Sequence, residues 1–459
     1  MRAHAIVAAA AAALLACTAA STTPSRSTAS TARSGATVQQ ATTRPADWPV
    51  YHFSRYRSGN YPDMPAPSSP HVAKSIKLDG AVYASPLVVA ANTLVATENN
   101  TVYKFNARYG TVWKAHLGSP SPAGQRPCGN IDPLGITGTP AYDAGKNQVY
   151  VAAELSGSPP SHRLYALNYT TGKVVWSRSL DLPGVDQKTM QERGALAVVG
   201  SRVYVPFGGL AGDCGQYKGR VVGVPTSGSG STISYTVPTS REAGIWAPPG
   251  PVADYANNIY VAVGNGAAGQ GDPYDHSDSI LQLSTSLSLA SYFAPSSWAS
   301  DNDVDADLGS QGPTITGSFI FAAGKSGTAY VLSRTHLGGI GGQVSSASLC
   351  RSFGGTAVNG SVVYVPCTDG IRAVRIDSKG IMHVLWHAAS NINGSPVIGG
   401  GRIWALDPGA GKLYALNPST GAVTNAVSVG TANRFATPSI YGRDMRVGTL
   451  NGIVDVRTS

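Results

Sequence analysis

The stretch that decides the fold is Leu164-Tyr165-Ala166-Leu167-Asn168, followed shortly by Thr171-Gly172-Lys173-Val174-Val175-Trp176. Its first half alternates in a way that predicts a β-strand with one buried apolar face. Asn168 and Gly172 favour a turn that reverses the chain, and a second strand starts near Val174. A single sheet of this kind cannot bury its faces alone, so further sheets must stack against it.

The same unit recurs along the chain. Close copies are Val102-Tyr103-Lys104-Phe105-Asn106 and Leu413-Tyr414-Ala415-Leu416-Asn417, and weaker copies complete a series whose second residues stand at positions 103, 165, 222, 281, 330, 372, 414 and 454. The last three intervals are 42, 42 and 40 residues, which is typical of a four-stranded propeller blade. The longer early intervals leave room for loop insertions. The sequence therefore predicts an all-β, eight-bladed β-propeller.

The composition agrees with this prediction. The chain has 459 residues with 54 Gly and 30 Pro, which argues against long helices. Its only continuous apolar run, Ala5 to Ala16, is shorter than the about 20 residues that a membrane-spanning helix needs. The net charge of +9 is spread without Lys/Arg runs, so we expect no nucleic-acid partner.

The first 17 residues are typical of an export signal. Arg2 precedes the apolar run Ile6 to Leu15, and small residues follow. The stretch Leu14-Leu15-Ala16-Cys17 resembles a bacterial lipobox, in which the cysteine is lipidated. Leu15 replaces the usual small residue, so simple secretion stays open. We expect an exported protein that is held on the extracytoplasmic face of the cell membrane by a lipid anchor alone, or is secreted.

Residues 18–47 are rich in Thr, Ser and Ala and have no strand or helix periodicity. This composition predicts a disordered tether. Residues 48–459 then form a single propeller domain, which we expect to be monomeric.

Cysteine parity supports export. Without Cys17, four cysteines remain, and an even number in an exported protein predicts two disulfides. Cys350 and Cys367 are close in sequence and flank one strand pair, so we pair them. Cys128 then pairs with Cys214.

The pattern L-Y-A-L-x-x-x-T-G-x-V-x-W resembles the tryptophan-docking repeat of quinoprotein-type propellers. The segments Asp47-Trp48-Pro49-Val50-Tyr51 and Arg57-Ser58-Gly59 resemble the opening of that family, so the resemblance covers residues 47–459. In the family the N-terminal stretch supplies the last strand of the final blade. The final copy here ends at Thr458, too early for four strands, so we expect residues 48–80 to close the ring.

Some members of this family are dehydrogenases that hold pyrroloquinoline quinone (PQQ) and Ca²⁺ in the central channel. Others have no cofactor, including a lipoprotein of the outer-membrane barrel-assembly machinery. The resemblance implies that Trp246 forms a cofactor floor and that Lys325 touches the quinone oxygens. It also implies that Asn265 supplies a Ca²⁺ ligand, with Asp213 near the position of a second one.

The resemblance places the catalytic carboxylate in a run of aspartates after Trp298. We favour Asp303 or Asp305 as the base that takes the alcohol proton. The four aspartates at positions 301, 303, 305 and 307 alternate, so on a strand they would share one face that could bind Ca²⁺. A solvated acidic loop is the simpler interpretation.

Two functions stay open. The first is a binding or scaffold module for a protein or polymer of the bacterial cell envelope. The alternative is a PQQ- and calcium-dependent dehydrogenase that oxidises an alcohol or sugar. The dehydrogenases' adjacent Cys-Cys pair and a Cys-x-x-Cys-His haem motif are both absent from the sequence. Convergence of the aspartate run, Asn265 and Lys325 in the channel would favour the enzyme.

Overall fold

The structure is a computed structural model that describes residues 44–389 and 391–459. The predicted signal segment, Cys17 and most of the predicted tether lie outside the described residues. Pro45–Ser459 forms one compact unit. Within it, the Ala46 amide donates to Asp63 at 2.8 Å and Asp47 accepts from the Ala90 amide at 2.8 Å, so the folded body begins slightly before Trp48. None of the described helices has the length and apolar character needed to span a membrane.

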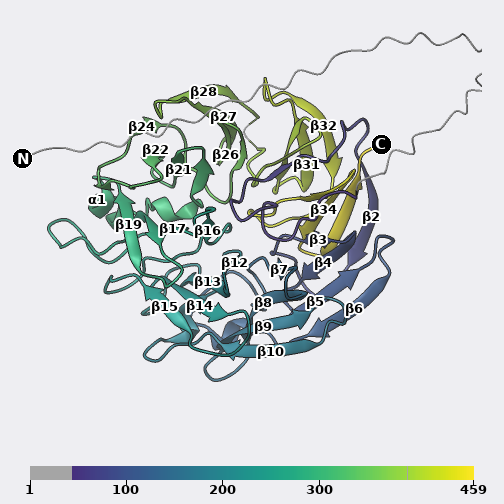
Figure 1. The fold of residues 1–459 in the computed structure, drawn as a ribbon, viewed down its shortest axis with the longest axis horizontal. Coiled ribbons are helices and arrows are strands. Elements are labelled where there is room, and N and C mark those ends of the chain that lie inside the picture. Colours follow the sequence, from purple (N-terminus) through teal and green to yellow (C-terminus); the bar gives the residue numbers. More distant parts are fainter. Residues whose placement is uncertain (1–43, 390) are drawn as a thin grey trace, which may run out of the picture. The chain divides into compact units, whose positions relative to one another are not determined.

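The described strands form eight sheets that follow one another around a ring (Figure 1). The first blade contains β3 (Leu87–Val89), β4 (Asn92–Ala96), β5 (Thr101–Phe105) and β6 (Thr111–His116). The second contains β7 (Ala141–Asp143), β8 (Gln148–Leu155), β9 (Ser161–Asn168) and β10 (Val174–Ser179). The third contains β11 (Met190–Gln191), β12 (Ala197–Val199), β13 (Arg202–Gly209), β14 (Arg220–Pro225) and β15 (Ile233–Thr236).

The middle blades have the same order. The fourth contains β16 (Val252–Ala253), β17 (Ile259–Val263), β18 (Ser279–Leu283), β19 (Leu289–Ala294) and β23 (Gly339–Ile340). The fifth contains β20 (Thr314–Thr316), β21 (Phe319–Ala323), β22 (Thr328–Ser333) and β24 (Ser345–Ser348). The sixth contains β25 (Ala357–Asn359), β26 (Val362–Cys367), β27 (Gly370–Ile376) and β28 (Met382–His387).

The last two blades each take a strand from the start of the body. The seventh contains β1 (Asn60–Tyr61), β29 (Val397–Gly399), β30 (Arg402–Asp407), β31 (Lys412–Leu416) and β32 (Val423–Ser428). The eighth contains β2 (His71–Lys77), β33 (Ser439–Tyr441), β34 (Asp444–Thr449) and β35 (Gly452–Arg457). β2 pairs antiparallel with β35, and β1 pairs parallel with β29.

The eight repeat positions found in the sequence all fall in the third strand of their blades, from Tyr103 in β5 to Val454 in β35. The prediction of an all-β, eight-bladed propeller is confirmed. Short helices occupy only Ala123–Gln125 (η1), Gln187–Thr189 (η2), Trp298–Asp303 (α1) and Leu308–Ser310 (η3) among the described residues.

The repeat tryptophans pack between blades. Trp113 at the end of the first blade lies on the turn of the second, where its ring nitrogen donates to the Tyr169 carbonyl at 3.0 Å. Gly172 in that turn has φ +72°, and a Cβ atom there would lie 2.6 Å from the Trp113 ring. Trp176 meets Gly228 and Trp386 meets Gly421 in the same way. The glycine of the repeat is therefore needed both for its left-handed backbone and for the close approach of the indole.

The segment before β1 lies across the inner ends of several blades. His52 contacts the Thr356 carbonyl at 2.9 Å and the Thr437 hydroxyl at 3.0 Å. The buried guanidinium of Arg57 donates to the carbonyls of Leu196 at 2.9 Å and Pro251 at 3.2 Å. These partners come from the third, fourth, sixth and eighth blades, so the segment ties their inner ends together.

Candidate functional site

A cavity of about 450 Å³ lies where loops from several blades meet. Six residues singled out in the sequence line it: Asp213, Trp246, Asn265, Asp305, Asp307 and Lys325. Others were not expected there, among them Tyr83, Asn130, Arg193, Tyr217, Phe353, Asn433, Arg434 and Phe435. The volume lies in the range of small-molecule sites, which is about 300–1,000 Å³.

The blade plan explains why residues far apart in sequence meet here. Asp213, Asn265 and Lys325 follow the second strand of their blades, namely β13, β17 and β21. Trp246 and Phe353 precede the first strand of theirs, β16 and β25. Both kinds of loop lie at the same end of a blade, because the first two strands run antiparallel. Closing eight such blades into a ring brings these loops to one mouth.

Lys325 holds two aspartates at the cavity. Its Nζ lies 2.5 Å from Oδ1 of Asp305 and 2.7 Å from Oδ2 of Asp307, and 5.6 Å from the centre of the Trp246 ring. Burial opposes the charge of the ammonium, but the two carboxylates outweigh it and raise the pKa of Lys325. Lys325 is therefore a charged ammonium held in the cavity wall between two carboxylates.

Asp307 is the fully buried member of this group, with 0% of its surface exposed. Its Oδ1 has no hydrogen-bond partner. Burial raises the pKa of Asp307 to about 7, although Lys325 opposes the rise. At neutral pH this carboxyl is thus present in both protonation states, as a proton acceptor or donor requires.

The structure separates the aspartates of the run. Asp303 ends helix α1, is exposed, and does not line the cavity. Asp305 lines the cavity with an exposed side chain and stands in a turn with φ +52°. The proposed single strand face is wrong, because the segment forms a helix, a turn and a 3₁₀ helix. Trp298 is buried, and Asn302 binds the amide of Gly266 and the carbonyl of Ala268, which fixes that helix.

The two residues expected near calcium have other partners. Asp213 Oδ1 accepts a 2.5 Å hydrogen bond from the Tyr217 hydroxyl. Asn265 donates through Nδ2 to Glu242 at 3.3 Å, and Glu242 in turn pairs with Arg241. Burial raises the pKa of Glu242, and Arg241 opposes the rise.

Three aromatic rings and two arginines form another part of the wall. The Trp246 ring centre lies 6.5 Å from that of Phe353 and 6.3 Å from that of Phe435. The Arg193 guanidinium carbon lies 4.3 Å from the Phe435 ring centre, and that of Arg434 lies 3.8 Å from the Phe353 centre. Arg193, Phe353, Arg434 and Phe435 share with Trp246 a position shortly before the first strand of a blade, which is the sequence signal that places them at this mouth.

Both predicted disulfides form, Cys128–Cys214 and Cys350–Cys367. Each braces a loop of the cavity. Cys214 follows Asp213, and Cys128 belongs to the loop that carries Asn130. Cys350 and Cys367 hold the loop that leads to Phe353.

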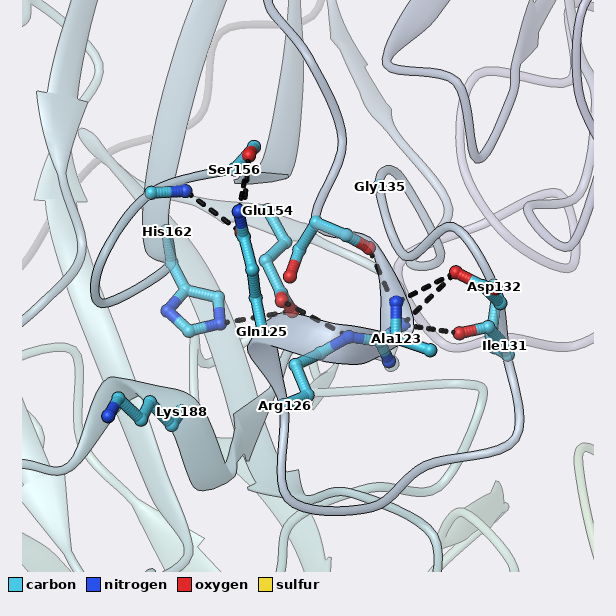
Figure 2. Close-up of polar contacts among 12 residues, drawn as sticks. Ala123, Gln125, Arg126, Ile131, Asp132, Gly135, Glu154, Ser156, His162 and Lys188 are labelled. Atoms are coloured by element: carbon cyan, nitrogen blue, oxygen red, sulfur yellow. Dashed lines mark hydrogen bonds and ion pairs between the residues drawn. The ribbon is translucent and has the colours of Figure 1, made fainter.

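The Asn130 loop is also anchored by a buried arginine (Figure 2). Arg126 donates to the Ile131 carbonyl at 2.7 Å, and its Nε lies 4.0 Å from Glu154 Oε1. Glu154 in turn faces His162, whose ring also binds Asp181 at 2.8 Å. Burial opposes protonation of His162, but the two carboxylates outweigh it and raise its pKa to about 10. The charged imidazole completes a buried ionic network behind the loop.

Comparison with known proteins places this geometry in context. The family model described as "Outer membrane protein assembly factor BamB" matches residues 72–206. The quinohemoprotein alcohol dehydrogenase from Comamonas testosteroni superimposes with a TM-score of 0.71 at 16% identity, covering 90% of this chain and 80% of that one. BamB from Moraxella catarrhalis gives a TM-score of 0.58 at 17% identity, covering 85% of this chain and 98% of that one. No curated protein sequence matches the chain.

These similarities confirm the resemblance to PQQ-type β-propeller repeat proteins. Dehydrogenases and an assembly factor share this architecture, so the fold alone does not choose between the two functions. The two disulfides are consistent with a location outside the cytoplasm.

Proposed function

We propose that the cavity binds a planar, anionic quinone of the PQQ type, and that the protein is a quinoprotein dehydrogenase that oxidises an alcohol or sugar outside the cytoplasm. The observation that supports this most directly is the meeting of Trp246, Asn265, Asp307 and Lys325 at one cavity. Trp246 and Asn265 belong to loops of the fourth blade, and Asp307 and Lys325 belong to loops of the fifth.

The residues present fit such a ligand. Trp246 offers a flat apolar surface, and Lys325 offers an ammonium 5.6 Å from its ring centre. Arg193 and Arg434 add cationic groups that line the same space. A planar ring with acidic substituents would therefore find both stacking and charge partners. When bound, a quinone of this type supplies a two-electron acceptor.

Asp307 is the residue that we propose as the base, in place of Asp303. The Asp307 carboxylate takes the proton of the substrate hydroxyl, and Lys325 stabilises the ionised form before transfer. Its pKa of about 7 suits a proton acceptor at neutral pH. Asp305 pairs with the same ammonium and is our second candidate.

Calcium fits these residues poorly. Among the described residues, the cluster of three His, Cys, Asp or Glu ligand atoms within 4.8 Å is that of Cys350, Cys367 and Asp369, which is not in the cavity wall. Lys325 already balances Asp307, and Asp213 is held by Tyr217. Asn265 and Asp213 are the oxygen donors that we would test for calcium, but we assign no step to the ion.

The direct test combines reconstitution with turnover. The mature protein is incubated with PQQ, with and without Ca²⁺, and dye-linked oxidation of simple alcohols and sugars is followed. Turnover that is lost in Asp307→Asn and retained in Asp303→Asn supports the proposal. Absence of cofactor binding at micromolar concentrations in both conditions would exclude it.

The second candidate is a scaffold that binds a protein or polymer of the cell envelope, anchored through Cys17. It is favoured by the match of residues 72–206 to the assembly-factor model and by the poor calcium site. Crosslinking in intact cells followed by pull-down tests it. One reproducible envelope partner, captured equally by Trp246→Ala, supports a scaffold whose function does not use the cavity.

A further inference from the structure

The two arginines of the cavity have no ionic partner. Within the described residues, neither the Arg193 nor the Arg434 guanidinium makes a hydrogen bond or ion pair with a protein group. Glu98 is the carboxylate whose charge reaches Arg193, but it accepts from the Gly135 amide at 2.7 Å and from Thr137 at 2.9 Å. Unpaired guanidinium groups at a cavity wall are placed to receive an anion.

The other charges of the wall do not neutralise them. Asp305 and Asp307 both bind Lys325, and Asp213 accepts from Tyr217. Lys325 is thus committed to protein carboxylates. Arg193 and Arg434 are the cations that remain for the acidic groups of a ligand.

Aromatic rings fix the two guanidinium groups in place. Arg193 lies over Phe435, with its guanidinium carbon 6.0 Å from the Trp246 ring centre. Arg434 lies over Phe353, 6.0 Å from the Phe435 ring centre. A guanidinium over an aromatic ring keeps N–H groups that can bind a carboxylate through two hydrogen bonds. Each arginine is therefore held beside a ring before a ligand arrives.

We infer that Arg193 and Arg434 form a two-arginine clamp that selects planar aromatic ligands bearing two separate carboxylate groups. The inference rests on the proposed binding function of the cavity, and it names the chemical class that the cavity selects. The ring of the ligand lies against Trp246, and each carboxylate meets one guanidinium. A neutral ring of the same shape would leave both arginines unpaired in a partly desolvated wall.

The test measures dissociation constants by titration of the full mature protein with three probes. PQQ is the first probe, and its trimethyl ester keeps the ring but removes the charges. Naphthalene-2,6-dicarboxylate is planar and doubly charged but does not undergo quinone chemistry. The variants are Arg193→Gln, Arg434→Gln, and the control Arg108→Gln, whose arginine is exposed and does not line the cavity.

The clamp predicts that each cavity substitution weakens binding of the charged probes by about tenfold or more, the effect of losing one charge-assisted contact. Arg108→Gln should leave the affinity for the charged probes nearly unchanged, and the ester should bind weakly to every form. Arg193→Lys and Arg434→Lys, which keep the charge but lose the planar fork, should give intermediate values. Thermal unfolding of each variant checks that it is folded.

The outcomes separate the clamp from the quinone function. If the dicarboxylate binds with arginine dependence but PQQ does not bind, the clamp stands and the quinone proposal fails. If PQQ and its ester bind equally well, or if folded Arg193→Gln and Arg434→Gln bind both charged probes as the wild type does, the clamp is overturned. Failure of both charged probes to bind also overturns the clamp.

Discussion

Lys325 Nζ lies 2.7 Å from Oδ2 of Asp307, a carboxyl group that has no exposed surface. This pair joins two loops at the cavity end of the fifth blade, because Asp307 precedes β20 and Lys325 follows β21. It also sets the protonation of the group that we propose as the base.

Removal of the ammonium should raise the pKa of Asp307 above its present value of about 7, since burial then acts without the opposing charge. Turnover that depends on ionised Asp307 rises with pH as this carboxyl loses its proton. We expect Lys325→Met to shift this rise to higher pH. The pH dependence of turnover, or of carboxyl vibrations in difference infrared spectra, measures this. If turnover of a folded Lys325→Met variant rises over the same pH range as that of the wild type, Asp307 is not the titrating group.

Asp307 should also make stability depend on pH. Its pKa in the folded protein is raised from 3.8 to about 7, so the folded state holds the proton more tightly than the unfolded state. This favourable contribution is complete below about pH 4 and is lost as the pH rises toward 7. Its size is on the order of a few kcal/mol.

Asp307→Asn should therefore lose less stability than the wild type over that pH range. Urea unfolding at about pH 4.5 and pH 7.5 gives the comparison, with Asp303→Asn as the exposed control. Glu98, whose pKa burial also raises to about 7, contributes equally to the wild type and the variants and cancels. Parallel pH profiles for wild type and Asp307→Asn would refute the assignment.

The docking of Trp113 on Gly172 can be tested with a matched glycine. Gly172 and Gly200 have φ values of +72° and +59°, but only at Gly172 would a Cβ meet another atom, the Trp113 ring. Gly200→Ala should cost about 1 kcal/mol for backbone strain alone. Gly172→Ala should cost about 1–3 kcal/mol more, because the indole must move. Equal losses in chemical denaturation would show that the contact adds nothing.

The two disulfides should differ in their contribution to stability. Cys128–Cys214 closes a separation of 86 residues and Cys350–Cys367 one of 17. The longer loop loses more entropy in the unfolded chain, by about 1 kcal/mol. The double variants Cys128→Ser/Cys214→Ser and Cys350→Ser/Cys367→Ser measure this. Since Cys214 is next to Asp213, we expect the first pair of substitutions also to weaken ligand binding. Retained affinity would show that the Asn130 and Asp213 loops keep their positions without it.

The repeat made the fold predictable from the sequence. Alternating strands, a turn with Asn and Gly, and a spacing near 42 residues are local features, and each recurs where the third strand of a blade lies. Both disulfides followed from cysteine parity and sequence proximity. The fold and the disulfides could be predicted without knowing which distant loops lie together.

The site was only partly predictable. Trp246, Asn265 and Lys325 stand in recognisable motifs, and all three line the cavity. The choice of Asp303 and Asp305 came from the resemblance of the segment after Trp298 to the catalytic segment of the family. That resemblance does not show which of four closely spaced aspartates is buried beside Lys325. Arg193 and Arg434 were missed because the ring over which each lies, Phe435 for Arg193 and Phe353 for Arg434, comes from a distant part of the chain.

The central claim is that the cavity binds a planar anionic quinone, and calorimetric titration of the mature protein with PQQ tests it most directly. We predict one site per chain with micromolar or tighter affinity, lost in folded Trp246→Ala and kept in Asp303→Asn. Heats no larger than those of dilution, with and without Ca²⁺, would contradict it.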